Sequence, residues 1–152
     1  MGIDYRSDVE RGLTISVVDG LVTAEEFHAH AERQRNDPVW HTTTRLLTDA
    51  RTAVTRAVGT DELSAFAALY AGMRSGELPF RNAIVAGVDF DLAGRYGDLR
   101  TDRSGSSTIA FNDLETACTW LGIEVSVARS VIGTLRDELR GAGRDVTTGD
   151  ST

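Results

Sequence analysis

The chain has 152 residues, which is long enough to bury the core of one domain and too short for two ordinary ones. Its 23 acidic residues outnumber its 16 basic ones, and the net charge of −7 disfavours binding to nucleic acid or to an anionic membrane surface. Every basic residue is an arginine, which excludes the chemistries of Schiff-base and P-loop lysines.

The sequence also bears on the cellular compartment. Cys118 is the one cysteine, so an intrachain disulfide is impossible and an oxidising compartment gains no support. No signal peptide is recognisable, and no apolar stretch approaches the roughly 18 residues that a membrane helix needs. We therefore expect a cytoplasmic protein without an integral membrane segment.

Two strands are predicted at the start of the chain. Residues 3–7 and 13–17 alternate apolar with polar side chains on either side of a polar turn at residues 8–12, which predicts an antiparallel pair. Asp19 and Gly20 then form a dipeptide that is typical of tight turns. The second strand should therefore end before Asp19.

The first helix has well-defined ends in the sequence. Thr23 and Glu26 have the spacing of a capping box, in which each side chain bonds a backbone N–H near the start of the helix. The helix should end by Asp37, because Pro38 disfavours the α conformation in the residue before it.

Strands and helices alternate through the rest of the chain. Short apolar runs predict strands at residues 45–48, 83–88 and 108–111. Apolar residues at helical spacing predict helices in four further segments, at residues 60–75, 89–99, 112–121 and 125–140. This order predicts a single-domain α/β fold, with a mixed sheet of about five strands, an antiparallel first pair and a covering of helices.

The helix at residues 112–121 is expected to begin with Asn112 as its N-cap, since Glu115 stands three residues later. Its core face should consist of residues at the i, i+3, i+4 and i+7 positions, namely Leu114, Ala117, Cys118 and Leu121. Cys118 is therefore expected to be a buried, unreactive thiol.

Three features of the chain resemble the SpoIIAA-like group of STAS-type domains, which is related to the CRAL-TRIO lipid-binding group. The first is a strand-turn-helix opening, GLTISVVDGLVTAEEF, and the second is a strand ending in Asp, RLLTDAR. The third is a later pair of strand-helix units, VDFDLAGRY and IAFNDLETACTWL. The resemblance covers roughly residues 3–121. It implies a small α/β domain, usually non-enzymatic, that binds protein partners or a small apolar ligand.

One departure from this family concerns regulation. Anti-sigma-factor antagonists carry a phosphorylatable Ser after the strand that corresponds to residues 45–48, whereas this chain has Asp49, Ala50, Arg51 and Thr52 there. Partner switching by phosphorylation is therefore not expected. We expect residues 1–122 to form the SpoIIAA-like domain, residues 123–141 a C-terminal helical extension, and residues 142–152 a flexible tail.

Candidates for catalysis and metal binding are few. Asp49 and Asp89 each follow a predicted strand, where they could share a magnesium site or could cap the next segment, and capping is favoured. His28 and His30 are about 200° apart around a helix and cannot chelate one ion together. We therefore expect no catalytic residue, no metal site and no cofactor.

The sequence predicts a non-enzymatic interaction or regulatory module that forms a homodimer. An alternative is a carrier or sensor of a small apolar, lipid-like ligand, with Phe66, Tyr70 and Met73 near the pocket. Six residues are expected at a ligand or partner surface. They are these three, Arg95 and Tyr96 on the helix after Asp89, and Trp120 at the end of the helix at residues 112–121.

Overall fold

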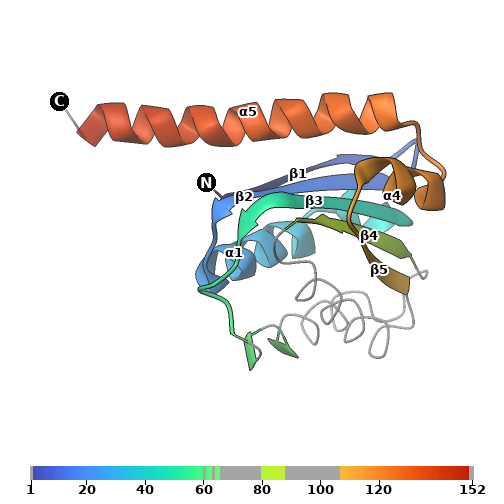
Figure 1. Cartoon of the computed structure of the whole chain (residues 1–152), viewed down its shortest axis with the longest axis horizontal. Helices are drawn as coiled ribbons and strands as arrows, with labels where there is room; N and C mark the ends of the chain where they lie inside the picture. The colour runs from blue at the N-terminus through green and yellow to red at the C-terminus, as the bar shows by residue number, and fades with distance from the viewer. Residues whose placement is uncertain (1, 60, 63, 66–79, 88–106, 151–152) are drawn as a thin grey trace.

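The structure is a computed structural model, and it describes residues 2–59, 61–62, 64–65, 80–87 and 107–150, with side chains as far as residue 142. Its centre is a five-stranded sheet with the strand order β1-β2-β3-β4-β5 (Figure 1). The strands are β1 (Gly2–Asp8), β2 (Leu13–Leu21), β3 (Arg45–Val54), β4 (Arg81–Ala86) and β5 (Ser107–Phe111). β1 is antiparallel to β2, and the remaining neighbours are parallel, so the predicted mixed α/β sheet is confirmed.

Helices lie on both faces of the sheet (Figure 1). α1 (Ala24–Arg35) packs on one face and is followed by the short 3₁₀ helix η1 (Trp40–Thr42). α4 (Leu114–Leu121) and α5 (Val125–Asp150) cover the other face, with α4 over β3 and β4 and α5 over β1 and β2.

The main core lies between the sheet and the helices α4 and α5. Alternate residues of β2 and β3 point toward these helices, because successive side chains of a strand face opposite sides. The predicted core face of α4 is confirmed, since all four of its residues are buried there. The buried cluster joins strand residues Leu13, Ile15, Val17, Leu47, Ala83 and Val85 to helix residues Leu114, Ala117, Cys118, Leu121, Ala128, Ile132 and Leu135.

The opposite face of the sheet, which α1 partly covers, has a different character. Among the described residues, this face has two small apolar clusters, one around Val22 and Phe27 and one around Ala31 and Trp40. Several buried strand residues on this face are polar, namely Thr14, Ser16, Asn82 and Thr108. The face under α4 and α5 therefore contains the main apolar cluster, and the opposite face buries several uncharged polar side chains.

Two strands are longer than predicted. β2 continues through Asp19 and Gly20, so the predicted turn at that dipeptide is wrong; its pairing with β3 is irregular there, and Gly20 takes the positive φ of 72° that glycine accommodates. β3 continues past Asp49 to Val54, so the expectation that Asp49 ends the strand is also wrong. Both aspartates instead point into an ion-paired network under α5.

Helix starts are partly as predicted. The capping box of Thr23 and Glu26 is present at the start of α1. The expected N-cap of α4 is wrong by one residue, because Asp113 rather than Asn112 accepts a hydrogen bond from the Thr116 backbone N–H, at 2.8 Å.

α5 is a 26-residue helix that extends ten residues past its predicted end at residue 140. Its C-terminal turns continue beyond the edge of the sheet (Figure 1). In the part of the chain that the structure describes, no helix has both the length and the apolar character needed to span a membrane.

Candidate functional site

Of the residues predicted at a ligand or partner surface, Trp120 is the one that the structure describes. Phe66, Tyr70, Met73, Arg95 and Tyr96 lie outside the described residues.

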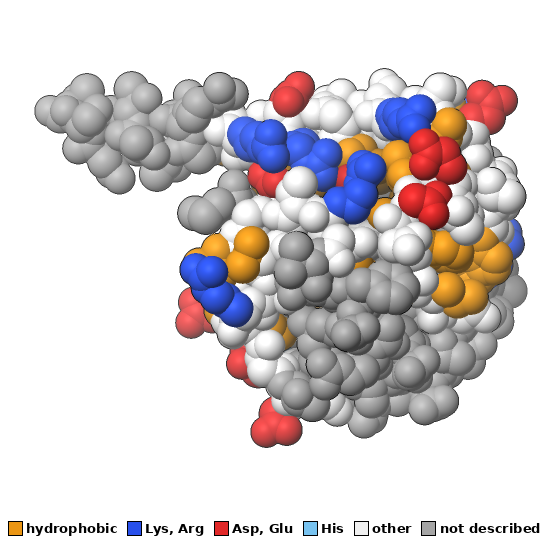
Figure 2. Space-filling view, viewed as in Figure 1, with side chains coloured by type: hydrophobic (Ala, Val, Ile, Leu, Met, Phe, Trp, Pro, Cys, Tyr) orange, Lys and Arg blue, Asp and Glu red, His pale blue; other side chains and the backbone are white. Residues whose placement is uncertain are grey.

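Trp120 lies at the end of α4, half-buried against the edge of the sheet. Its ring packs on Phe111 of β5 at a centroid distance of 5.7 Å, and the Arg81 guanidinium lies over it at 5.5 Å. Ile109, two residues before Phe111 on the same strand, is 42% exposed. We call Ile109, Phe111 and Trp120 the Trp120 patch; Figure 2 shows an apolar area on the side where β5 and α4 lie.

Arginines at the starts of two strands hold the end of α4 beneath this patch. Arg81 donates from Nη1 to the Trp120 carbonyl at 2.6 Å, and Arg45 donates from Nη1 to the Gly122 carbonyl at 3.2 Å. The last carbonyls of a helix have no partner within the helix, and cations there also interact favourably with the helix dipole. The backbone under Trp120 is therefore fixed to the sheet.

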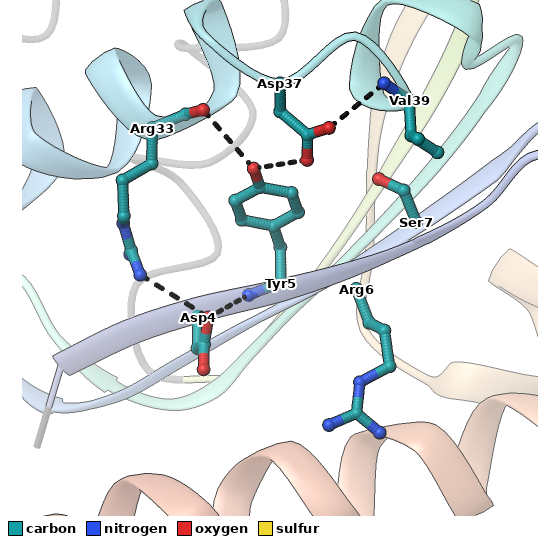
Figure 3. Close-up of a pocket in the computed structure, with 7 residues that line it drawn as sticks. All are labelled: Asp4, Tyr5, Arg6, Ser7, Arg33, Asp37 and Val39. Atoms are coloured by element: carbon teal, nitrogen blue, oxygen red, sulfur yellow. Dashed lines mark hydrogen bonds and ion pairs between the residues drawn. The ribbon is translucent and has the colours of Figure 1, made fainter.

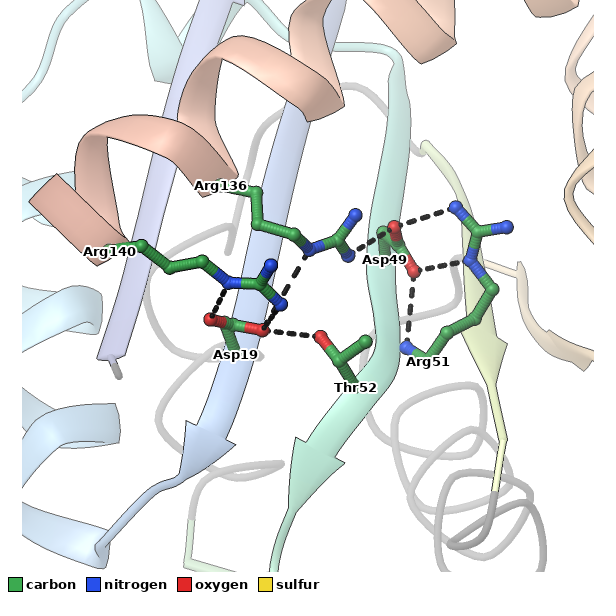
Figure 4. Close-up of polar contacts among 6 residues, drawn as sticks. All are labelled: Asp19, Asp49, Arg51, Thr52, Arg136 and Arg140. Atoms are coloured by element: carbon green, nitrogen blue, oxygen red, sulfur yellow. Dashed lines mark hydrogen bonds and ion pairs between the residues drawn. The ribbon is translucent and has the colours of Figure 1, made fainter.

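A second cluster of polar side chains lies between α5 and the sheet (Figure 4). Asp49 of β3 is 0% exposed. Its carboxylate accepts bonds from Arg51 Nε and Nη2, both at 2.9 Å, and from Arg136 Nη2 of α5 at 2.8 Å. The Arg51 backbone N–H also donates to Asp49, at 3.1 Å, so donors surround both carboxylate oxygens.

Asp19 of β2 forms the other half of this network. Arg140 donates to it from Nε at 3.1 Å and from Nη2 at 3.2 Å, and the Thr52 hydroxyl donates at 2.6 Å. Arg136 links the two aspartates, because its Nε lies 3.8 Å from Asp19 Oδ1 while its Nη2 bonds Asp49. Figure 2 shows basic side chains gathered along this boundary between α5 and the sheet.

Both carboxylates are held in the ionised form. Burial alone would raise the pKa of Asp49, but the hydrogen bonds from Arg51 and Arg136 outweigh it and lower that pKa. Burial likewise opposes ionisation of Asp19, and bonds from Arg140 and Thr52 keep its pKa below the ordinary value. These ionised carboxylates attach α5 to the sheet. Asp49 accepts four hydrogen bonds, which fill the acceptor positions of a carboxylate.

Asp49 is therefore more than the cap that the sequence favoured. Its expected partner in a magnesium site, Asp89, lies outside the described residues. Within the ranges that the structure describes, no group of three or more His, Cys, Asp or Glu side chains is placed to hold a metal ion.

A cleft of about 410 Å³ lies along the outer strand β1 (Figure 3), and we call it the β1 cleft. Tyr5 points from β1 toward the end of α1, where its hydroxyl donates to Asp37 Oδ2 at 2.7 Å. Arg33 of α1 donates to the Ile3 carbonyl at 2.9 Å, and Asp4 accepts from the Tyr5 backbone N–H at 2.8 Å. Most of the residues that line the cleft have polar side chains, and two of these side chains bond backbone groups of β1.

Two titratable side chains beside the β1 cleft, Tyr5 and His30, are held in their neutral forms. Burial raises the pKa of Tyr5, and the hydrogen bond to Asp37 raises it further. His30 is buried against the edge of the Tyr5 ring at 5.4 Å, and burial, assisted by the nearby Arg33, lowers its pKa to about 3. His30 is thus a packed neutral histidine.

The predicted burial of Cys118 is confirmed, because its thiol lies on the core face of α4. Burial raises the pKa of this thiol, which disfavours the reactive thiolate.

The sequence interpretation missed the partners of Asp49. One signal was available, since Arg136 and Arg140 are four residues apart on α5 and belong to one helix face. Asp19 and Asp49 also continue inward-facing alternations, after Val17 and Leu47 respectively. Charged residues at inward positions of strands indicate buried ion pairs, because an unpaired buried charge is costly.

Comparisons with known proteins concern the fold. No family model and no curated protein matches the sequence. Among solved structures, an uncharacterized protein of the DUF3478 family from Shewanella loihica, described as having a SpoIIAA-like fold, superposes with a TM-score of 0.51 at 17% sequence identity. The match covers 79% of this chain and 94% of that one. The mixed five-stranded sheet with its helices is therefore a SpoIIAA-like α/β fold.

Proposed function

We propose that the chain is a non-enzymatic, cytoplasmic interaction or regulatory module that acts as a homodimer through the Trp120 patch. The observation that supports this function is the exposure of Ile109 beside an aromatic pair that is fixed to the sheet. Covering apolar side chains that are held in place on a surface stabilises a complex, and aromatic residues are enriched at such contacts.

In our proposal a second copy of the chain covers this surface, since the three side chains of the patch are uncharged. Arg81, beside the patch, directs its guanidinium donors to the carbonyls of Trp120 and Leu121. A twofold contact brings the same apolar side chains of both copies together, as in isologous dimers. Complete burial of an exposed side chain of this size contributes about 1.5–3 kcal/mol, and covering the 42% of Ile109 that is exposed contributes a part of that amount.

In our proposal, regulation of this module does not involve phosphorylation at residues 49–52 of β3. The positions where anti-sigma-factor antagonists carry their Ser hold Asp49 and Arg51, which are ion-paired to each other at 2.9 Å. In our proposal, control comes from partner binding at the Trp120 patch.

Sedimentation velocity of the full chain at micromolar concentration tests the dimer. We expect a dimer for the wild type and a monomer for Ile109→Asp, because a carboxylate in the middle of an apolar contact would be buried without a partner. The matched control is Val9→Asp, which changes an equally apolar residue that is 60% exposed in the turn between β1 and β2.

Val9→Asp should remain dimeric. A wild type that sediments as a monomer contradicts the dimer, and an Ile109→Asp variant that remains dimeric excludes the Trp120 patch as its interface. Circular dichroism spectra that match the wild type would show that both variants are folded.

The alternative function, a carrier or sensor of a small apolar ligand, stays a prediction. The residues expected near its pocket, Phe66, Tyr70 and Met73, lie outside the described part of the chain. Native mass spectrometry of freshly purified protein checks it, since a persistent adduct supports carriage and a consistently bare chain contradicts it.

A further inference from the structure

One carboxylate in the β1 cleft lacks a counter-charge. Four of the described side chains that line this cleft are charged, namely Asp4, Arg6, Arg33 and Asp37. Arg33 lies 3.5 Å from Asp4, and Arg6 lies 3.0 Å from Glu138 of α5, so both arginines already have an acidic partner. Within the part of the chain that the structure describes, Asp37 has no ion-pair partner.

Asp37 is held in place by two hydrogen bonds that leave part of its carboxylate available. The Tyr5 hydroxyl donates to Oδ2 at 2.7 Å, and the Val39 backbone N–H donates to Oδ1 at 3.0 Å. A carboxylate has about four acceptor positions, so each oxygen of Asp37 retains about one. Because Asp37 is only partly buried, a guest in the cleft can reach these positions.

Two hydroxyl groups lie on the same side of β1 as this carboxylate (Figure 3). Tyr5 keeps its proton, because burial and then the bond to Asp37 raise its pKa, and its oxygen can still accept a hydrogen bond. The Ser7 hydroxyl lies 2.7 Å from that of Thr14 and also retains an acceptor position. The guanidinium group of Arg33 points away from Asp37 toward Asp4 (Figure 3).

The charge and the available acceptors together indicate the class of guest. A cation that carries N–H donors pairs with Asp37, whereas an anion would be repelled and a neutral guest would cover the carboxylate without pairing its charge. An ammonium group has three donors and no acceptor, which suits a carboxylate beside two hydroxyls. The volume of the cleft, about 410 Å³, lies within the range of about 300–1,000 Å³ that is typical of small-molecule sites.

We propose that the β1 cleft binds the primary ammonium group of a small organic amine, with Asp37 as the counter-charge and the hydroxyls of Tyr5 and Ser7 as further acceptors. β1 and β5 are the two outer strands of the sheet, so this site lies at the opposite edge from the Trp120 patch. Amine binding is therefore independent of the homodimer, and either proposal can fail without the other.

A pair of alkyl cations tests recognition in the full wild-type chain. n-Butylammonium and butyltrimethylammonium share their charge and their alkyl chain, but only n-butylammonium has N–H donors. Each is titrated at pH 7 and constant ionic strength, and NMR follows the backbone amide signals of Ser7 and Val39. We expect saturable shifts with n-butylammonium, and binding of butyltrimethylammonium that is at least about tenfold weaker, because its charge cannot donate hydrogen bonds.

Two results of these titrations overturn the proposal. Equal affinity for the two cations, or shifts that do not saturate, would mean that the cleft does not recognise N–H donors. Tighter binding of an acetylated Gly-Lys-Gly peptide than of n-butylammonium would identify a lysine of a protein partner as the guest, and would also contradict a small amine.

Asp37→Asn tests the counter-charge. The amide has nearly the same size and keeps one acceptor oxygen, but it removes the negative charge, so we expect the affinity for n-butylammonium to fall at least about tenfold. Asp137→Asn, which removes an exposed carboxylate of α5 outside the cleft, is the matched control and should leave the affinity nearly unchanged, since solvent and salt screen exposed charges.

The amide spectra of both variants show whether they are folded, and the comparison of the two cations in the wild type does not depend on either variant. An unchanged affinity in Asp37→Asn, or an equal loss in the two variants, contradicts the role of Asp37.

Discussion

At the scale of single residues, Asp49 shows how a buried charge is maintained. It is fully buried on β3 and bonded by Arg51 from its own strand and by Arg136 from α5. Transferring a carboxylate out of water is costly, and opposite charges together with hydrogen bonds repay this cost only where the geometry is good. Removing one partner from such a pair is destabilising, because the remaining charge stays buried.

We predict that Asp49→Asn lowers the free energy of unfolding by about 3–5 kcal/mol, the range typical of breaking a buried pair. Asn keeps the size of the side chain and removes the charge that Arg136 requires. Urea denaturation at pH 7 measures the change. Asp137→Asn, which alters an exposed carboxyl on α5, is the control and should change stability by less than about 0.5 kcal/mol.

The stability difference between the wild type and Asp49→Asn should depend on pH. The folded pKa of Asp49 is below its unfolded value, which is near 3.9, so its stabilising contribution is present above about pH 4 and is lost as the pH falls through the folded pKa. The difference between the wild type and Asp49→Asn should therefore shrink in urea titrations below pH 4. A difference that stays constant with pH would exclude the ionised Asp49 as its source.

The sequence singled out Asp49 as a candidate cap or metal ligand, but it did not indicate the buried ion pairs that Asp49 forms. Its partner Arg136 is 87 positions away in the chain, and no local pattern specifies which helix will lie over β3. Trp120 was predicted at a surface from its place beside the core stripe of α4, and the structure supplies its neighbours Phe111 and Arg81.

At the scale of elements, two glycines have opposite roles in neighbouring helices. Gly122 ends α4 with a φ of 73°, a conformation that residues with a side chain rarely adopt. Gly133 lies within α5, where glycine weakens a helix relative to alanine. A Cβ at either position would meet no other atom within 4 Å, so the backbone conformation alone decides the effect of a substitution.

We predict that Gly122→Ala destabilises the protein by about 1 kcal/mol, and that Gly133→Ala stabilises it by about 0.5–1 kcal/mol. Each variant is the matched control of the other, because neither adds a contact. Thermal unfolding should show shifts of opposite sign, and shifts of the same sign would mean that the left-handed conformation does not limit the choice of residue at Gly122.

Elements with local signals were predicted well, and elements that depend on distant pairing were not. The capping box of Thr23 and Glu26 lies within one turn of a helix and was read directly from the sequence. Asp19 and Gly20 read as a turn, yet pairing with Thr52 and Ala53 of β3 keeps them in a strand. Tertiary pairing thus overrides a two-residue turn signal.

At the scale of the whole molecule, α5 belongs to the main core. Ile132 and Leu135 are buried in the same cluster as Leu13, Ile15 and Val17 of β2. Burying a side chain of this kind contributes about 1.5–3 kcal/mol, and the net stability of a domain is only about 5–15 kcal/mol. The helix that the sequence suggested as an extension after residue 122 is therefore required, in our interpretation, for the sheet to remain covered.

We predict that a chain ending after Gly122 does not unfold cooperatively, because the outer face of β2 would be exposed to water. A chain ending after Ala142 retains Ile132, Leu135 and Arg140 and should unfold cooperatively, so it serves as the control. Urea titrations followed by circular dichroism distinguish the two. A cooperative transition in the shorter chain would instead support an independent domain at residues 1–122.

The fold could be predicted because alternation within strands and helical spacing specify which faces are apolar, and those faces suffice to order the layers. The polar arrangements could not, because they arise where residues from distant elements meet. Arg81 bonding the end of α4 and Arg140 bonding β2 are examples that no spacing within one element reveals.

The hydrogen bonds that Arg33 and Asp4 make to the backbone of β1 also bear on the behaviour of concentrated solutions. An outer strand with unpaired amide and carbonyl groups can template the addition of a strand from another molecule, which is a first step toward aggregation. Here the Ile3 carbonyl and the Tyr5 N–H are already bonded to side chains. These two contacts leave fewer backbone groups for a foreign strand to recruit, and thereby favour a protein that stays dispersed when it is abundant.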